Sequence, residues 1–236
     1  MWDAARLLGV LLTIDTSTPV LVVGLVRASD MPGGRGPVVE VLATREIEDC
    51  RQHNELLVPT VLAVVAEAGV QLDDVAGVVV GCGPGPFTGL RVGMASAMAL
   101  ADALGVECVG VRSLDAIAVD ALRGVPDVVD ARSVLVVTDA RRREGYWARY
   151  ECGGGLPRLV EGPEVSPPAE IVGDVDVLCV PDGAWEQKVG ARGRVVVGRP
   201  SASASALAEL AVGGVTVDVV PLYLRRPDAQ VPKAMR

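Results

Sequence analysis

Four consecutive residues near the start of the chain combine a carboxylate with three hydroxyl groups: Asp15, Thr16, Ser17 and Thr18. They separate two apolar runs, residues 7–14 and 20–27, which predict two strands joined by a tight turn. At the tip of such a hairpin, Asp15 could meet a nucleotide phosphate through a metal ion, and the hydroxyls could bind it directly. The same residue types also build turns through local hydrogen bonds. A nucleotide site and a structural turn are both compatible with this pattern.

A second candidate is a loop rich in glycine and proline, Gly83-Pro84-Gly85-Pro86-Phe87-Thr88-Gly89, between a predicted strand and a predicted helix. Backbone N–H groups at the start of a helix attract anions, and the glycines would allow a close approach. The prolines stiffen the loop and remove donors. The spacing matches neither a Walker A loop nor a GxGxxG motif. The loop is therefore either a phosphate cradle or a rigid connector, and Gly83 and Gly85 join Asp15, Thr16 and Ser17 as a possible vestigial nucleotide site.

The chain has one histidine, His53, and position 57, where a second metal ligand of an HxxxH helix would stand, is Leu57. A lone histidine makes a poor metal site and a poor member of a catalytic triad, so metallohydrolase and Ser-His chemistry are not expected. The five cysteines contain no CxxC pair and predict reduced thiols. We expect neither a catalytic set nor a bound metal in this chain.

Two predicted helices, residues 55–68 and 88–104, lack the polar outer stripe that solvent requires. One stripe runs through Arg91, Ala95, Met98 and Asp102, and the other passes through Leu62. Apolar helix faces mark contact sites unless other segments of the chain cover them. We therefore assign Leu62, Arg91, Ala95 and Met98 to a candidate partner interface.

A run of three arginines lies in the stretch from Asp139 to Glu144, which has no glycine before Gly145. The stretch separates two apolar runs and predicts a hairpin tip. Its arginines are either a solvated tip or a docking patch for an acidic partner.

The bulk composition restricts the class of protein. Of 236 residues, 50% are hydrophobic and only 3% aromatic, as expected for alanine-rich helices on valine-rich strands. The net charge of −8 argues against broad binding of a nucleic-acid backbone by this chain alone. The apolar run before Asp15 is too short to span a membrane and has no cleavage site, which predicts a cytoplasmic protein with no membrane partner.

The elements that must position these residues alternate in type. The first half reads as strands 7–14, 20–27 and 38–47, helix 55–68, strand 75–82, helix 88–104, strand 106–111 and helix 113–122, with caps expected at Asn54, Thr88 and Ser113. The second half repeats part of this order, with strands at 134–137, 145–151, near 159, at 177–180 and at 195–197, and a helix at 202–211. The prediction is an α/β protein with mixed sheets flanked by helices and a reduced second lobe. The expected domains are residues 7–112, with the partner-binding helices, and 113–236, with the C-terminal tail.

Five segments carry a resemblance to a known family: residues 13–18, 81–93, 110–114 and 139–146, and Pro221-Leu222-Tyr223-Leu224-Arg225. They resemble the TsaB (YeaZ) family, sometimes labelled glycoprotease-like, in the right order over nearly the whole chain. Only residues 28–37 look like an insertion. The resemblance implies a two-lobed actin/Hsp70/sugar-kinase-like fold. It also implies a subunit that pairs with the catalytic TsaD, together with the ATPase TsaE, to transfer threonylcarbamoyl to N6 of adenosine 37 in tRNAs that read codons beginning with A.

This sequence differs from the superfamily pattern at two places that affect nucleotide binding by this chain. Ser17 stands where the nucleotide turn of the superfamily usually has glycine, and the 139–144 turn lacks glycines. The expectation is a non-catalytic scaffold that needs no cofactor, with ATP and a metal on the partner subunits and tRNA met only through the complex. A small-molecule kinase using ATP, a glycoprotease-like peptidase and a regulatory homodimer remain as alternatives.

Overall fold

The first half of the chain folds into a five-stranded mixed sheet. The computed structural model describes residues 7–30, 37–48, 52–125, 131–197 and 201–225. The strand order is β3-β2-β1-β4-β5. The first three strands pair antiparallel, as two successive hairpins predict, and β1, β4 and β5 pair in parallel. The strands are β1 (Gly9–Asp15), β2 (Leu21–Asp30), β3 (Pro37–Ile47), β4 (Val75–Gly81) and β5 (Glu107–Val111).

The second half repeats this topology in a second sheet of order β10-β9-β6-β7-β8. Its first three strands are again antiparallel, and β6, β9 and β10 are parallel. The strands are β6 (Ser133–Asp139), β7 (Gly145–Glu151), β8 (Arg158–Ser166), β9 (Val172–Val180) and β10 (Gly190–Val197). The expectation that the second half echoes the first is thus confirmed at the level of strand order.

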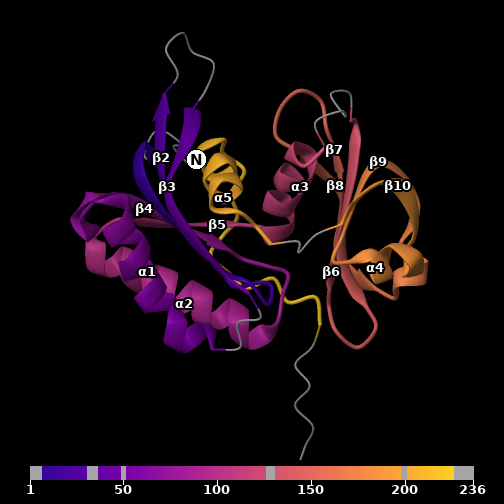
Figure 1. Cartoon of the computed structure of the whole chain (residues 1–236), viewed down its shortest axis with the longest axis horizontal. Helices are drawn as coiled ribbons and strands as arrows, with labels where there is room; N and C mark the ends of the chain where they lie inside the picture. Colours follow the sequence, from indigo (N-terminus) through magenta and orange to yellow (C-terminus); the bar gives the residue numbers. More distant parts are fainter. Residues whose placement is uncertain (1–6, 31–36, 49–51, 126–130, 198–200, 226–236) are drawn as a thin grey trace, which may run out of the picture.

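Helices separate and cover the two sheets. The helices are α1 (His53–Ala68), α2 (Phe87–Leu104), α3 (Ser113–Arg123), α4 (Gly183–Lys188) and α5 (Ala204–Val212), with short 3-10 turns η2 (Leu72–Asp74) and η3 (Pro168–Glu170). In Figure 1, α1 and α2 cover the outer face of the first sheet, α3 and α5 lie between the sheets, and the short α4 lies outside the second sheet. The second half has shorter helices than the first at the equivalent positions. The short η3 and α4 follow β8 and β9, whereas the long α1 and α2 follow β3 and β4.

The apolar core follows these layers. The central cluster joins both halves, because α5 packs on β1 and β4, α3 packs on β6, β7 and β9, and the two helices pack on each other. A buried polar contact lies in the same layer: the Tyr150 hydroxyl donates to Asp115 Oδ1 at 2.9 Å, and Arg112 pairs with the same carboxylate at 2.9 Å. Helix α5 comes from the second half of the chain yet packs on the first sheet. The domain boundary between residues 112 and 113 stays a prediction.

Several predicted boundaries need correction. Helix α1 begins at His53 after Gln52, so Asn54 is not its cap. Helix α2 begins at Phe87 after Pro86, so Thr88 is not a cap either, and neither helix has a capping side chain. Ser113 is the first residue of α3 rather than its cap, and its hydroxyl bonds elsewhere. The physical reason is the same for Asn54, Thr88 and Ser113. Each residue already lies within the helix, and from there its side chain cannot accept a hydrogen bond from the N–H groups of the first turn.

Two further points concern loops and membranes. The predicted loop at residues 28–37 is strand at both ends, since β2 runs to Asp30 and β3 begins at Pro37, and its middle lies outside the described residues. Among the described residues, no helix combines the length and apolar character needed to cross a bilayer.

Candidate functional site

The carboxylate of Asp15 lies at the end of β1 and is fully buried. Its Oδ1 accepts hydrogen bonds from the backbone N–H and the hydroxyl of Ser17, at 2.9 and 2.7 Å. Its Oδ2 accepts from the Ser113 hydroxyl at 2.6 Å, and that hydroxyl accepts from the Gly83 N–H at 3.1 Å. Burial raises the pKa of Asp15, although these three donors oppose the shift. The carboxylate therefore ties the β1–β2 turn to the glycine loop and to the start of α3.

Glycines of the loop and of α2 make room for this turn. A Cβ on Gly85 would lie 2.2 Å from the Ser17 carbonyl oxygen, and one on Gly93 would lie 2.1 Å from Thr16 Oγ1. Thr16 Oγ1 donates to the Gly89 carbonyl at 2.8 Å. The space that a phosphate would need next to these glycines is thus filled by the chain's own turn.

The structure brings together all five residues predicted for the vestigial nucleotide site, Asp15, Thr16, Ser17, Gly83 and Gly85. Their polar side-chain atoms bond to one another or to nearby main chain, and the turn packs directly against Gly85. The sequence analysis missed Ser113 as a member of this network. A hydroxyl at a strand-to-helix junction was the only local signal, and nothing in the sequence linked it to a residue 98 positions earlier.

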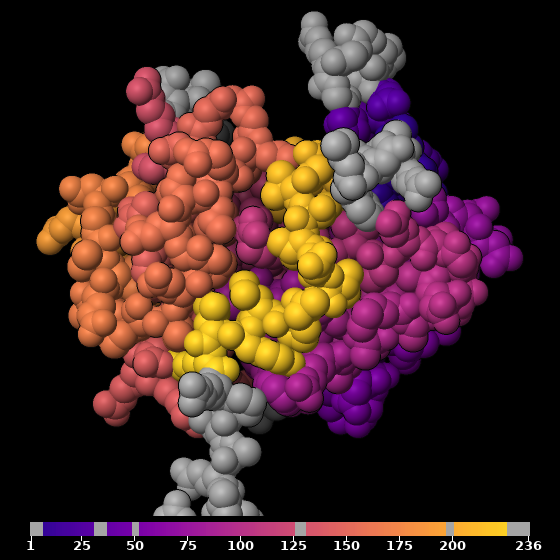
Figure 2. All heavy atoms as spheres, turned by 180° about the vertical axis from the view of Figure 1, so that it is seen from behind, coloured from indigo at the N-terminus to yellow at the C-terminus, as the bar shows by residue number. Residues whose placement is uncertain are grey.

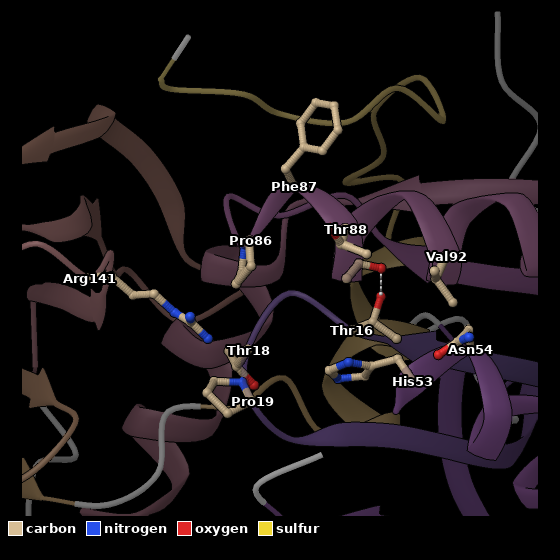
Figure 3. Close-up of a pocket in the computed structure, with 11 residues that line it drawn as sticks. Thr16, Thr18, Pro19, His53, Asn54, Pro86, Phe87, Thr88, Val92 and Arg141 are labelled. Atoms are coloured by element: carbon tan, nitrogen blue, oxygen red, sulfur yellow. Dashed lines mark hydrogen bonds between the residues drawn. The ribbon is translucent and has the colours of Figure 1, made fainter. Parts of the chain in front are cut away.

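Beside this network lies a cavity of about 820 Å³. Figure 3 shows that Arg141 reaches toward it from the β6–β7 hairpin, whereas His53 and Asn54 come from α1 and Thr88 from α2. The remaining lining residues are uncharged: Thr16, Thr18, Pro19, Pro86, Phe87, Gly89 and Val92. Segments of both halves of the chain therefore form its wall.

His53 is half-buried and is the first residue of α1. Its Nε2 atom is buried and has no hydrogen-bond partner among the described residues. Burial lowers the pKa of the imidazole, which favours the neutral form. Within the described part of the chain, no group of three histidine, cysteine or acidic side chains is placed to hold a metal ion.

The residues predicted for a partner interface lie on the outer faces of α1 and α2. Leu62 on α1 is 52% exposed and Met98 on α2 is 44% exposed, and Ala95 and Arg91 are exposed on the same helix as Met98. Val58, one turn before Leu62, is also exposed. We call Val58, Leu62, Ala95 and Met98 the α1/α2 face. No described segment of the chain covers it.

Arg91 lies at one end of this face and is held by aromatic rings. Its Nε donates to the Tyr223 hydroxyl at 2.7 Å, and its guanidinium stacks 3.8 Å above the centre of the Phe87 ring. Phe87 and Tyr223 stack on each other with ring centres 5.0 Å apart. The only phenylalanine of the chain thus stands at the surface, in contact with a residue from the C-terminal segment.

The C-terminal segment continues to the second half. We call residues 222–225 the strap, and Figure 2 shows the chain there passing between the two halves. The Leu222 N–H donates to the Cys82 carbonyl of the first half at 3.0 Å. Arg225 donates to the Ala140 carbonyl at 2.9 Å and pairs with Glu144 in the second half.

Arg225 contacts the arginine run predicted at the hairpin tip. Arg141, Arg142 and Arg143 all have positive φ, at 60°, 54° and 63°, a left-handed conformation that costs energy in residues other than glycine. Asp139 Oδ1 accepts from the Arg141 N–H at 2.7 Å, and Arg225 holds the adjacent carbonyls. The tip is thus a fixed turn, supported from both sides.

A family model described as "TsaD: tRNA N6-adenosine threonylcarbamoyltransferase" matches residues 40–231. An uncharacterized protein of Mycobacterium tuberculosis is 46% identical over 222 residues, 93% of each chain. The Escherichia coli "tRNA threonylcarbamoyladenosine biosynthesis protein TsaB" is 36% identical over 101 residues, 43% of this chain and 42% of that protein.

Solved structures agree with these sequences. YeaZ from Pseudomonas aeruginosa superposes with a TM-score of 0.73 at 27% identity, over 92% of this chain and 100% of that one. A second structure from the same organism, described as similar to peptidase YEAZ, has a TM-score of 0.72 at 28% identity over the same shares. Together with the two repeated sheets, this confirms the predicted two-lobed α/β fold of the actin/Hsp70/sugar-kinase type.

Proposed function

Because this chain belongs to the TsaB (YeaZ) family, whose named members are tRNA threonylcarbamoyladenosine biosynthesis proteins, we propose that it is a non-catalytic subunit of that system. In this role it binds a TsaD-type enzyme and supports transfer of threonylcarbamoyl to N6 of adenosine 37 in tRNA. The ATP and the metal of the reaction belong to partner subunits, including a TsaE-type ATPase. The protein meets tRNA only within the complex, in the cytoplasm.

The observation that carries the proposal is the uncovered α1/α2 face. Leu62 and Met98 expose 52% and 44% of their surfaces on neighbouring helices, and Val58 adds 46%. Large apolar side chains that gather on one face mark a contact with another protein. The small Ala95 between them would let a partner helix approach closely. Arg91 and Tyr223, residue types enriched at the centres of interfaces, stand at the end of the same face.

A second argument concerns the kinase alternative. A kinase of this fold needs a phosphate-binding turn in each lobe and a general base in the cleft between them. In the first lobe, Thr16 and Ser17 fill the space beside the loop glycines. In the second lobe, three left-handed arginines replace the glycines of such a turn. Both features favour a subunit without phosphoryl-transfer chemistry.

The peptidase alternative needs an activated nucleophile or a metal. Burial raises the pKa of Cys82 and of Cys179 to about 12, so neither thiol forms a reactive thiolate near neutral pH. Burial likewise raises the pKa of Cys108, to about 11, and that of Cys152. The described thiols therefore suit packing better than catalysis.

The proposal is tested with the purified chain and the TsaD-type enzyme of the same organism. We expect the two to elute together from a sizing column as a stoichiometric complex, and tRNA modification to depend on the presence of this chain. The chain alone should show no ATP turnover above a buffer control. Robust turnover of ATP or peptide by the isolated chain would instead support the kinase or peptidase. A homodimer without affinity for the enzyme would support the regulatory alternative.

A further inference from the structure

The first sheet ends in a long edge strand, β3. It stands last in the order β3-β2-β1-β4-β5, so that β2 is its neighbour on one side. Among the described residues, no backbone hydrogen bond joins β3 to a segment other than β2. Helices α1 and α5 pack on its two faces (Figure 1). Its outer edge is therefore what a further strand could pair with.

The equivalent edge of the second sheet is protected against such pairing. There β8 takes the place of β3 and carries Pro163 inside the strand. A proline cannot donate to a neighbouring strand, and proteins use prolines on edge strands to prevent pairing between molecules. The only proline of β3 is its first residue, Pro37. Residues 38–47 thus keep every backbone donor and acceptor.

A bulge at Leu42 decides which side chains of β3 share a face. Val41 and Ala43 lie opposite two adjacent residues of β2, at positions 26 and 25, so Leu42 has no counterpart there. An extra residue of this kind shifts the alternation of side chains by one position. Residues before and after Leu42 that are an odd number of positions apart therefore lie on the same face.

Glu40 and Arg45, five positions apart, are such a pair. They lie opposite Arg27 and Val23, which are four positions apart on β2. Their common face is the one that α1 covers, since Arg45 pairs with Glu67 of α1 at 3.3 Å. Glu40 pairs with Arg27 at 3.1 Å. The four charged side chains are all at least half exposed.

We propose that β3 pairs antiparallel with β3 of a second copy of this chain, about a two-fold axis beside Leu42. Leu42 of each copy then lies opposite Ala43 of the other. Glu40 of each copy lies opposite Arg45 of the other, and Val38 lies opposite Ile47. The two first sheets become one sheet that is continuous across the dimer.

The charges on the α1 side of this joint sheet alternate in sign. The row reads Arg27 and Glu40 of one copy, then Arg45 and Glu67 of the other. The two-fold axis repeats the row, so each of these charges lies beside an opposite one. Opposite charges that face each other across two strands stabilise their pairing.

Other registers lose this match. A shift of one residue would place side chains from the α1 side opposite side chains from the α5 side, because the period of a strand is two. A shift of two residues would keep the faces but would place Glu40 opposite Ala43 or Ile47, which carry no charge. The bulge and the charges therefore select the same register.

This dimer goes beyond the proposed function and does not rest on it. The α1/α2 face lies on the side of the helices that is turned away from the sheet, so pairing through β3 leaves Leu62 and Met98 exposed. A failure of the dimer leaves the proposed binding of the enzyme untouched, and the reverse also holds.

The test is sedimentation and light scattering of the isolated full chain over a range of concentrations. We expect a dimer, and amide exchange in residues 37–47 that is slower in concentrated than in dilute solution. Glu40→Arg and Arg45→Glu each place like charges opposite each other and should raise the dissociation constant of the dimer roughly tenfold. An equimolar mixture of the two variants restores both pairs of opposite charge and should regain the dimer.

Arg158→Glu is the matched control, because Arg158 lies on the edge strand β8 and also pairs with a carboxylate of the neighbouring strand, Glu151. It should leave the dimer unchanged. A chain that stays monomeric at every concentration, or a mixture of the two variants that stays monomeric, would overturn the proposal. So would a dimer that Met98→Glu breaks while exchange in residues 37–47 does not depend on concentration. Thermal melts verify that each variant is folded, and the exchange experiment on the parent chain needs no variant.

Discussion

At the scale of single residues, the sequence left two roles open for Asp15, in a nucleotide site or in a structural turn, and its surroundings favour the turn. Its carboxylate accepts three hydrogen bonds in a site closed to water, from Ser17 twice and from Ser113. A carboxylate that bound a phosphate through a metal would need a free oxygen toward solvent. Here both oxygens are used to hold three chain segments together.

This arrangement predicts the effect of removing the carboxylate. Asp15→Ala leaves three buried donors unpaired and should lower the free energy of unfolding by roughly 3 kcal/mol. Asp15→Asn keeps the acceptor for Ser17 and should cost less, about 1–2 kcal/mol. Urea denaturation measures both. Equal stability of the alanine variant and the parent chain would contradict the structural role.

The glycine loop gives a second prediction. Gly85→Ala places a methyl group 2.2 Å from the Ser17 carbonyl, and the loop must move away from the turn. Since Gly85 does not have a positive φ, the strain comes from this contact and not from its own backbone conformation. We expect a loss of about 2 kcal/mol or more.

The control for this variant is Gly153→Ala. No atom lies within 4 Å of a Cβ at that position, so the expected change stays within about 0.5 kcal/mol. If Gly85→Ala and Gly153→Ala had the same melting temperature, the close approach of the loop and turn would not be needed for stability.

Sequence reasoning drew attention to the turn and loop that the structure brings together, but not to their partners; their role as a nucleotide site stays a prediction. Asp15 and Gly85 stand out by residue type, because buried carboxylates and glycine loops are unusual. Ser113 and Arg225 do not, since hydroxyls and arginines are common and their contacts, 98 and 85 positions away, form only after folding.

At the scale of elements, the strap joins the two halves of the chain. Leu222 bonds to the strand-to-loop junction of the first half, and Tyr223 stacks on Phe87 of α2. Arg225 reaches the hairpin tip of the second half. The strap therefore fixes both the end of the α1/α2 face and the turn that carries Arg141.

Arg225→Ala should loosen this connection. It removes the bonds to the Ala140 and Arg141 carbonyls and the pair with Glu144, for a loss of about 1 kcal/mol in a partly exposed site. Hydrogen exchange should rise at residues 139–144, which lose their support. The control Arg194→Ala, an exposed residue of β10, should leave both stability and exchange at the tip unchanged. Protection at the tip that did not change in the Arg225 variant would count against the strap.

Elements with strong patterns were predicted closely. The apolar runs indicated all ten strands of the described residues, because most buried strands are continuous valine-rich segments; β7 is the exception, since it is buried but contains no valine. Helix α4 was missed, since six residues that begin with Gly183 carry no helical period. The helix starts were misplaced by one or two residues, because α1 and α2 begin without the capping side chains on which the prediction relied.

At the scale of the whole molecule, five layers alternate between helix and sheet. The inner layer of α3 and α5 is covered on both sides, and α4 is too short to cover the outer face of the second sheet widely. Helices α1 and α2 pack on the first sheet with one face, and their opposite face is exposed to solvent. The sequence predicted this bare side from the missing polar stripe, and the exposed Leu62 and Met98 agree with it.

The central claim is that the α1/α2 face binds a TsaD-type enzyme, and a charge at its centre tests the claim most directly. An unpaired charge buried in an interface costs roughly 3–5 kcal/mol, whereas a charge on an exposed surface changes stability by about 0.5 kcal/mol or less. Met98→Glu and Leu62→Glu should therefore abolish binding and leave a folded chain. Val172→Glu, at an apolar residue of β9 that is 59% exposed, is the matched control.

The measurement is size-exclusion chromatography with light scattering on each variant mixed with the enzyme, alongside thermal melts. The account predicts that the Met98 and Leu62 variants melt like the parent chain and elute alone, whereas the Val172 variant elutes with the enzyme. Folded Met98 and Leu62 variants that still elute with the enzyme would contradict it.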